Sequence, residues 1–158
     1  KLSQIKGLGE IKSIRILSAL EMGRRIVSRE VETQELNNPE RVWRNVLSDI
    51  TGLDHEIFIV IVLNSKNRIL KKSIVSCGTV SETIVHPREV FRAAIKENGS
   101  SIIICHNHPS GNLEPSKNDI NITERLVKAS KIIGIDILDH LIVTEESYCS
   151  LRETGYID

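Results

Sequence analysis

The sequence predicts an α/β fold, a mixed sheet flanked by helices, preceded by a short helical segment. Stretches rich in β-branched residues alternate with stretches of helical periodicity along most of the chain. Residues 57–63 are continuously apolar, which is typical of a strand buried on both faces. The 158 residues suffice for one domain with a sizeable core and a small appended segment. Helices covering both faces of the sheet are therefore expected.

The first segment, residues 1–30, combines a glycine-flanked turn with a helical pattern. Gly7 and Gly9 enclose a leucine, and apolar residues then recur at helical spacing to about Arg29. Residues 31–38 are polar and aperiodic, which predicts a linker. We place the domain boundary in this linker and assign residues 39–158 to the second domain.

The second domain is expected to open with a helix and a pair of strands. Asn38 and Pro39 form a helix-start signal, and Gly52 is expected to stop that helix. The elements predicted next are a strand at 57–63, a turn at 64–67, a paired strand at 69–77 and a short strand at 83–85.

The remainder of the domain continues the alternation of helices and strands. Pro87 opens a helix that Gly99 is expected to end, and a second helix is predicted from Asp119 to Gly134. Further strands are predicted at 101–105, 135–143 and 148–151.

Two histidines and an aspartate carry the strongest functional signal. His106 and His108 follow a predicted strand, and alternation places both side chains on one face. A turn-forming loop then leads to Asp119 at a helix start. Two imidazoles and a carboxylate with a vacant position are typical of catalytic zinc. The plainer alternatives are polar residues at a strand end and a helix cap in which Ser116 pairs with Asp119. The capping and metal-binding roles are compatible.

A zinc hydrolase also needs a general base that takes a proton from the attacking water. The candidates are Glu56, Glu82, Glu89, Glu97 and Glu114. Glu56 is preferred because it directly precedes the most buried strand and is anchored on a rigid element. Glu89 and Glu97 are expected on the polar face of a helix, whereas Glu114 lies in the metal loop and is the competing candidate.

These residues resemble a known motif. Glu56 ahead of an apolar strand, His106-x-His108-Pro109 and Ser116-x-x-Asp119 resemble the JAMM/MPN+ metalloprotease motif. More closely, nearly the whole chain resembles the RadC family. The motifs that carry this second likeness are Gly78-Thr79, Val85-His86-Pro87-Arg88-Glu89, His106-Asn107-His108-Pro109-Ser110-Gly111, Pro115-Ser116 and Asp139-His140.

The resemblance implies a JAMM/MPN-like fold of three layers, related to that of cytidine deaminases, with one Zn²⁺ per chain. By this likeness His106, His108 and Asp119 are zinc ligands, with a water as the fourth. Glu56 is the acid/base, and Ser116 donates a hydrogen bond to the developing oxyanion. The implied reaction is cleavage of a peptide or isopeptide amide by a metal-activated water, in a peptide or protein substrate.

The likeness also gives a reading of the first segment, as the hairpin and second helix of a helix-hairpin-helix module. Glycines in such hairpins let backbone N–H groups approach a DNA phosphate. The residues expected to make this contact are Lys6, Gly7, Gly9 and Lys12. Because the chain begins where a first helix should end, we expect it to be a fragment whose DNA contact is weak. The family's historical DNA repair name is not evidence of activity.

Other function classes are tested by composition and by missing residues. Lys and Arg balance Asp and Glu at 21 each, so bulk charge does not favour nonspecific nucleic-acid binding. Three cysteines without a Cys-x-x-Cys pair suit a reducing interior. No membrane span or signal peptide is visible, so we expect a cytoplasmic protein with no membrane partner. Substrate identity and oligomeric state are not readable from the sequence.

Two literal motif matches fail on chemistry. The string His-Asn-His is not an HNH nuclease signature, whose members are dispersed over a ββα unit. A zinc deaminase needs His-x-Glu and Pro-Cys-x-x-Cys, and the chain has neither. Asp139 and His140 should face opposite ways on a strand, so one of them is expected to have a structural or metal-supporting role. Cys105 and Asn107 are expected to point away from the metal, and Cys105 to be a core thiol.

The rival to the hydrolase hypothesis is a DNA-associated module, linked to repair or recombination, that binds or scaffolds and has a non-catalytic metal site. Absence of zinc from protein folded under metal-replete conditions would exclude the catalytic hypothesis. A salt-dependent DNA shift that is lost on changing Lys6 or Lys12 to Ala would support it.

Overall fold

The structure is a computed structural model that describes residues 5, 8–32, 35–77 and 85–157, with backbone alone for 24–32 and 76–77. The chain divides into two compact units, Lys1–Gln34 and Glu35–Asp158. In the part of the chain described, no helix has the length and apolarity needed to cross a membrane.

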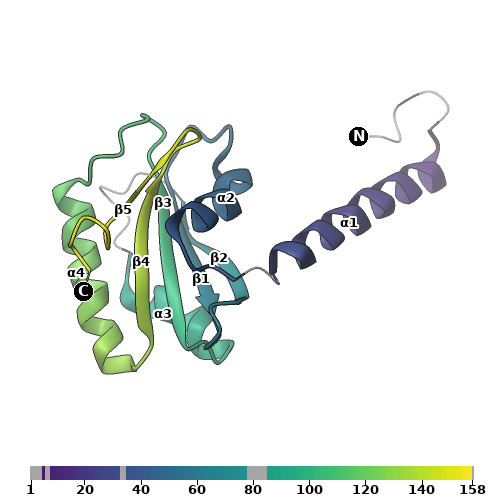
Figure 1. Cartoon of the computed structure of the whole chain (residues 1–158). Coiled ribbons are helices and arrows are strands. Elements are labelled where there is room, and N and C mark those ends of the chain that lie inside the picture. Colours follow the sequence, from purple (N-terminus) through teal and green to yellow (C-terminus); the bar gives the residue numbers. More distant parts are fainter. Residues whose placement is uncertain (1–4, 6–7, 33–34, 78–84, 158) are drawn as a thin grey trace. The chain divides into compact units, whose positions relative to one another are not determined.

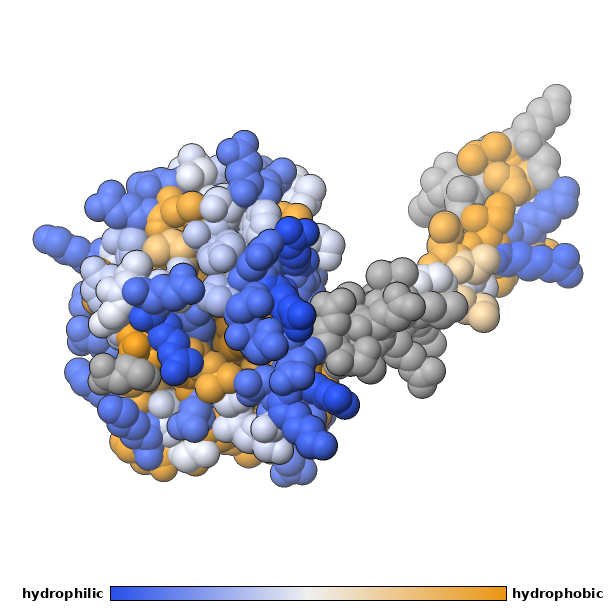
Figure 2. All heavy atoms as spheres, viewed as in Figure 1, coloured by the Kyte–Doolittle hydropathy of each residue, from blue (hydrophilic) through white to orange (hydrophobic). Residues whose placement is uncertain are grey.

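The first unit contains one long helix, α1, Glu10–Glu32. It continues past the expected end near Arg29, so residues 31 and 32 of the expected linker are helical, because no glycine or proline stops the helix there. Its described apolar side chains are largely exposed, and Figure 2 shows them as hydrophobic spheres along the helix surface. Lys6 and Gly7 lie outside the described residues.

The second unit is a mixed five-stranded sheet, which confirms the predicted fold class (Figure 1). Its strands are β1 (Ile57–Leu63), β2 (Ile69–Cys77), β3 (Ser101–Asn107), β4 (Asp136–Val143) and β5 (Tyr148–Ser150), in the order β2-β1-β3-β4-β5. Its helices are α2 (Pro39–Ile50), α3 (Pro87–Lys96) and α4 (Lys117–Ile133). Strands β3 and β4 are parallel, and the other neighbouring pairs are antiparallel.

Helices cover both faces of this sheet (Figure 1). Phe58 of β1, Phe91 of α3 and Leu126 of α4 belong to one buried cluster on one face. On the other face lies α2, whose Trp43 Nε1 donates to the Thr144 carbonyl at 2.9 Å, just after β4. Every residue of β1 is buried, as its uninterrupted apolar run predicts.

Several predicted element boundaries are confirmed. The Asn38 side chain accepts from the Arg41 N–H at the start of α2, and Gly134 ends α4 in the left-handed region at φ 77°. Strand β3 runs two residues further than predicted, to Asn107. Of the short strand predicted at 83–85, residues 83 and 84 lie outside the described residues.

The end of α3 differs from the expectation. Asn98 rather than Gly99 takes the left-handed conformation, with φ 52°, and the Gly99 N–H donates to the Ala94 carbonyl at 2.8 Å. Gly99 is required for another reason: a Cβ there would lie 2.3 Å from Val62 Cγ1 of β1. The glycine therefore permits close packing of this turn on the sheet.

The β3–α4–β4 crossover positions the candidate site. Strand β3 ends at Asn107, a loop follows, and α4 begins at Lys117 before the chain returns along β4. In α/β sheets the region beyond the carboxyl end of such a strand is where ligands bind. The predicted metal residues lie in this region.

Candidate metal centre

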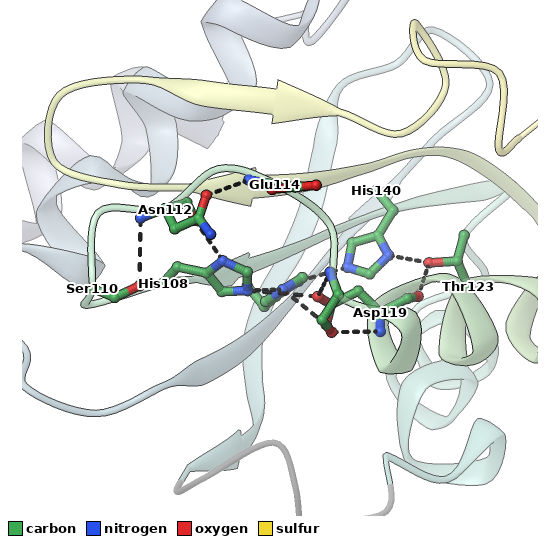
Figure 3. A network of polar contacts seen from close by, with 9 residues as sticks. His108, Ser110, Asn112, Glu114, Asp119, Thr123 and His140 are labelled. Atoms are coloured by element: carbon green, nitrogen blue, oxygen red, sulfur yellow. Dashed lines mark hydrogen bonds and ion pairs between the residues drawn. The ribbon is translucent and has the colours of Figure 1, made fainter.

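His106, His108 and Asp119 converge at the carboxyl end of β3. The two histidine Nε2 atoms are 3.0 Å apart, and Asp119 Oδ1 lies 3.3 Å from His106 Nε2. Asp119 Oδ2 lies 3.7 Å from His108 Nε2 (Figure 3). The ligand atoms all lie within 4.8 Å of one another, and this is the one such group among the described residues. The predicted ligand residues can therefore hold a metal ion together.

The start of α4 holds the Asp119 carboxylate in place. The Asp119 N–H donates to Ser116 Oγ at 3.2 Å, and the Ser116 N–H donates to Asp119 Oδ2 at 2.8 Å, a complete capping box. Asp119 occupies the third helical position of this box, where Glu or Gln is preferred. Ser116 itself is exposed, whereas the Asp119 side chain is 3% exposed. The capping role of Ser116 thus orients a candidate ligand.

The electrostatics of the site keep Asp119 ionised. Burial alone would raise the pKa of its carboxyl group, but the hydrogen bond and charge interaction with His106 and the hydrogen bonds from Ser116 outweigh burial. The pKa of Asp119 is therefore held well below its usual range. An ionised carboxylate is the form that binds a metal.

The loop after β3 orients His108. Its Nδ1 lies 2.6 Å from the Asn112 carbonyl oxygen, which can only accept, so Nδ1 carries the hydrogen of the neutral ring (Figure 3). The Nε2 lone pair then faces His106 and Asp119. The Gly111 N–H closes the loop on the His108 carbonyl at 3.0 Å, with Gly111 at φ 79°.

His106 is held on its other side by two aromatic rings. Its Nδ1 lies 2.9 Å from His140 Nε2 of β4, and the Phe58 ring stacks on it with centroids 6.1 Å apart. Both histidines are almost fully buried. Burial, and next the charge of His106, holds the pKa of His140 well below its ordinary value, so that ring is neutral.

A family model described as a RadC-like JAB domain matches residues 36–156. The chain belongs to the RadC family. Similar relatives, all named UPF0758 proteins, come from Desulforamulus reducens (44% identical), Geobacillus thermodenitrificans (44%) and Clostridium botulinum (46%). Each alignment covers 99% of this chain, and 70%, 70% and 69% of the respective relative.

Membership agrees with the resemblance inferred from the motifs. The RadC domain's five-stranded mixed sheet is consistent with a JAB/MPN fold, and its His-His-Asp group lies where that resemblance places a metal. The names of these relatives state no reaction and no metal.

In this RadC-like JAB domain, Asn107 points away from the histidines, as expected, and has a role that the sequence did not reveal. Its Oδ1 accepts from the Ile57 N–H at 2.7 Å, and its Nδ2 donates to the His55 carbonyl at 3.0 Å. The two bonds clamp the backbone on both sides of Glu56. Because Phe58 pairs with His106 in the sheet, the clamp holds Glu56 at the end of β1 that adjoins the histidines.

The other glutamate candidates differ in their settings. Glu89 forms ion pairs with Arg88 at 3.2 Å and Arg92 at 3.5 Å on the surface of α3. Glu114 is exposed, and its N–H donates to Asn112 Oδ1 at 2.9 Å. Glu82 lies outside the described residues. The acid/base role of Glu56 and the oxyanion role of Ser116 stay predictions.

Asp139 and His140 of the RadC domain have separate partners. His140 contacts His106, whereas Asp139 accepts from the Ser150 hydroxyl at 2.6 Å and from the Arg152 N–H at 3.2 Å. Thr123 of α4, which sequence reasoning did not single out, contacts His140 Nδ1 at 2.6 Å. The local signal for it is its position four residues after Asp119, which places both on one helix face.

Of the residues expected to contact DNA, two are described. The Gly9 carbonyl accepts from the Ser13 N–H at 3.0 Å at the start of α1, and Lys12 lies within that helix. The remaining two, Lys6 and Gly7, lie outside the described residues.

Proposed function

We propose that this RadC-like JAB domain is a zinc-dependent hydrolase that cleaves a peptide or isopeptide amide. The observation that carries the proposal is the convergence of two imidazole nitrogens and one ionised carboxylate within 4.8 Å. Nitrogen and oxygen donors in this number suit a catalytic zinc, which keeps one position open. His108 is 12% exposed, so the group can be reached from solvent on that side.

A zinc ion held here would lower the pKa of water toward 7 and polarise a substrate carbonyl. Glu56 takes a proton from the attacking water and delivers it to the nitrogen of the leaving amine. Support for this role comes from the Asn107 clamp on the Glu56 backbone at the same end of the sheet.

Ser116 supplies a hydrogen-bond donor for the developing oxyanion. Its Oγ accepts from the Asp119 N–H in the cap, while its O–H, which also helps to keep the Asp119 carboxylate ionised, is the donor proposed for the oxyanion. A donor aimed at charge that develops in the transition state contributes a large share of catalysis in such sites.

The substrate proposed is a peptide or protein. A cavity of about 290 Å³ adjoins His108 and is lined in part by Leu53, Pro109 and Glu146. This cavity has room for a substrate side chain next to His108, one of the three candidate ligands. Buried, free Cys105 fits a reducing compartment, and we propose a cytoplasmic location.

The division of the chain is part of the proposal. Residues 39–158 would form the catalytic domain, residues 31–38 the linker, and residues 1–30 a partial helix-hairpin-helix segment. Leu36 is nevertheless buried in the second unit, and its N–H donates to the Asn67 carbonyl at 2.9 Å.

The test is metal analysis followed by hydrolysis assays on protein prepared without chelator. We expect one zinc per chain, lost in His106→Ala and Asp119→Ala. With a panel of fluorogenic peptides and lysine-linked isopeptides, Glu56→Gln should keep its zinc and lose hydrolysis by about 10²- to 10⁴-fold. Glu124→Gln, on the exposed face of α4, is the matched control and should behave as wild type.

Each alternative result has a definite meaning. Absence of zinc from metal-replete protein refutes the proposed function. Full activity of Glu56→Gln moves the base to another residue, with Glu114 next. Zinc without hydrolysis of any panel member favours the rival, a DNA-associated module with a non-catalytic metal site.

A further inference from the structure

We infer that Thr123 and His140 are positioning residues that fix the ring tautomer of His106, so that its Nε2 lone pair faces the metal position. The inference concerns the site of the proposed function and rests on it for the identity of the metal. Neither residue is among the predicted ligands or catalytic residues.

An unbroken chain of hydrogen bonds connects the two residues to the metal group (Figure 3). Thr123 Oγ1 donates to the Asp119 carbonyl at 2.6 Å and lies 2.6 Å from His140 Nδ1. The other ring nitrogen of His140, Nε2, lies 2.9 Å from His106 Nδ1. The chain thus runs from the backbone of one candidate ligand, through α4 and β4, to the ring of another.

The direction of each bond follows from the number of hydrogens. A carbonyl oxygen only accepts, so the single hydroxyl hydrogen of Thr123 is used on Asp119. Thr123 Oγ1 must then accept from His140, which places a hydrogen on His140 Nδ1.

The direction of the hydrogen bond between His140 and His106 depends on whether the His140 ring is neutral. His140 is 0% exposed, and its two ring nitrogens contact a hydroxyl and an imidazole, with Asp139 directed elsewhere. A charged ring would lack a carboxylate partner there, so the neutral ring is favoured. Its Nε2 therefore accepts and His106 Nδ1 donates. In the neutral form of His106, which is the form that binds a metal, Nε2 then has no hydrogen.

The metal group is thereby prepared for a cation. The Asn112 carbonyl fixes the equivalent tautomer of His108, so in the neutral rings both Nε2 lone pairs face the position beside the Asp119 carboxylate where a cation would bind. If Thr123 lost its hydroxyl, His140 could reverse its hydrogens and His106 could carry hydrogen on Nε2, where it would oppose metal binding. Loss of such an outer hydrogen bond typically weakens metal binding by about 10- to 100-fold.

The decisive comparison is Thr123→Val against Thr123→Ser. Valine keeps the shape and removes the hydroxyl, whereas serine keeps the hydroxyl. In a chelator competition assay, Thr123→Val should bind zinc about 10- to 100-fold more weakly and Thr123→Ser within about threefold of wild type. Ser130→Ala removes another buried hydroxyl of α4, bonded to the Val127 carbonyl at 2.9 Å, and should leave zinc affinity unchanged.

A second readout needs no zinc and no substrate. Nitrogen-15 spectra of the histidine rings in metal-free wild-type protein should show hydrogen on Nδ1 of both His106 and His140. The spectrum of Thr123→Ser should be the same as that of the wild type. The spectrum of Thr123→Val should show a different tautomer of His106. Absence of hydrogen from His106 Nδ1 in the wild type, or unchanged zinc affinity in folded Thr123→Val, would overturn the inference.

The results that would contradict this inference differ from those that would contradict the proposed function. Zinc binding without hydrolysis contradicts the proposed function and leaves the affinity comparison intact. If the wild type binds no zinc, or Thr123→Val does not fold, the tautomers of the wild-type rings still decide the inference.

Discussion

Ser116 shows how one residue can serve stability and catalysis through different atoms. Its Oγ lone pair caps α4 by accepting from the Asp119 N–H, while its O–H is the donor proposed for the oxyanion. Substitutions that alter the cap and the donor to different extents can separate the two roles.

We predict that Ser116→Gly and Ser116→Ala lose activity equally but differ in stability. Glycine at an N-cap costs a few tenths of a kcal/mol, whereas alanine costs about 1 kcal/mol. Both variants lack the donor and should lose about 10²- to 10³-fold in the hydrolysis rate. Urea unfolding and the peptide assay measure the two effects, with Ser116→Thr as the control that keeps both. High activity in either variant would restrict Ser116 to capping.

Asp139 is the buried carboxylate next to the proposed positioning residue His140. Burial raises the pKa of its carboxyl group above 3.8, and the hydrogen bonds from Ser150, Arg152 and His140 offset only part of this effect. The folded chain therefore holds the Asp139 proton more firmly than the unfolded chain. Its contribution to stability is greatest at low pH and is lost as pH rises from about 3.8 through the raised folded-state pKa.

We predict that Asp139→Asn removes this pH-dependent contribution. The free energy of unfolding of the wild type, relative to the variant, should fall as pH rises through that window and then level off. Urea titrations at a series of pH values measure the difference. A wild-type profile parallel to that of the variant would show that Asp139 titrates alike in the folded and unfolded chains.

At the scale of elements, the junction of α3 with the sheet depends on a missing side chain. The turn after α3 lies so close to β1 that a Cβ on Gly99 would be 2.3 Å from Val62 Cγ1. The junction lies at the opposite end of the β1–β3 pair from the metal group, since Leu63 pairs with Ser101 whereas Phe58 pairs with His106, so it tests the fold and not the chemistry.

We predict that Gly99→Ala destabilises the protein by about 1–3 kcal/mol through overpacking. Val62→Ala removes the opposing methyl groups, so the double variant should be less destabilised than the sum of the two single changes. Urea unfolding of the four proteins gives the coupling energy. Strict additivity would mean that the backbone relaxes without involving Val62.

Strand order explains why the candidate site draws on three strands at once. Strand β3 lies between β1 and β4, so His106 can contact Phe58 on one side and His140 on the other. Helix α4 then brings Asp119 and Thr123 to the same place, four residues apart on one helix face.

At the scale of the whole molecule, metal binding should be linked to folding. The candidate ligands come from β3, its following loop and α4, and they converge only in the folded chain. A ligand that binds only the folded state stabilises it by mass action.

We predict that free zinc at 100 times its dissociation constant stabilises the wild type by about 2.7 kcal/mol. Thermal or urea unfolding with and without buffered zinc measures the effect. Asp119→Asn lacks the carboxylate and should show little of it. Equal stabilisation of this variant would place the zinc at another site.

Much of the architecture was predictable because its signals are local. The apolar run at 57–63, the Asn38-Pro39 helix start and the Ser116–Asp119 cap were confirmed, since periodicity and capping act over a few residues. The end of α1 was missed because polar residues without a breaker can stay helical. Gly99 was misread because its reason for being glycine is a neighbour in β1.

The sequence by itself determined the candidate metal-ligand set, since His-x-His after a strand and an aspartate at a helix start already place three donors along one short stretch. Only the tertiary structure decided their 3.0 to 3.7 Å separations and the connection of His106 to His140 and Thr123. The reason is that His140 reaches His106 through the parallel pairing of β3 with β4 across the α4 crossover. Such pairing depends on packing of the whole sheet, which no local pattern encodes.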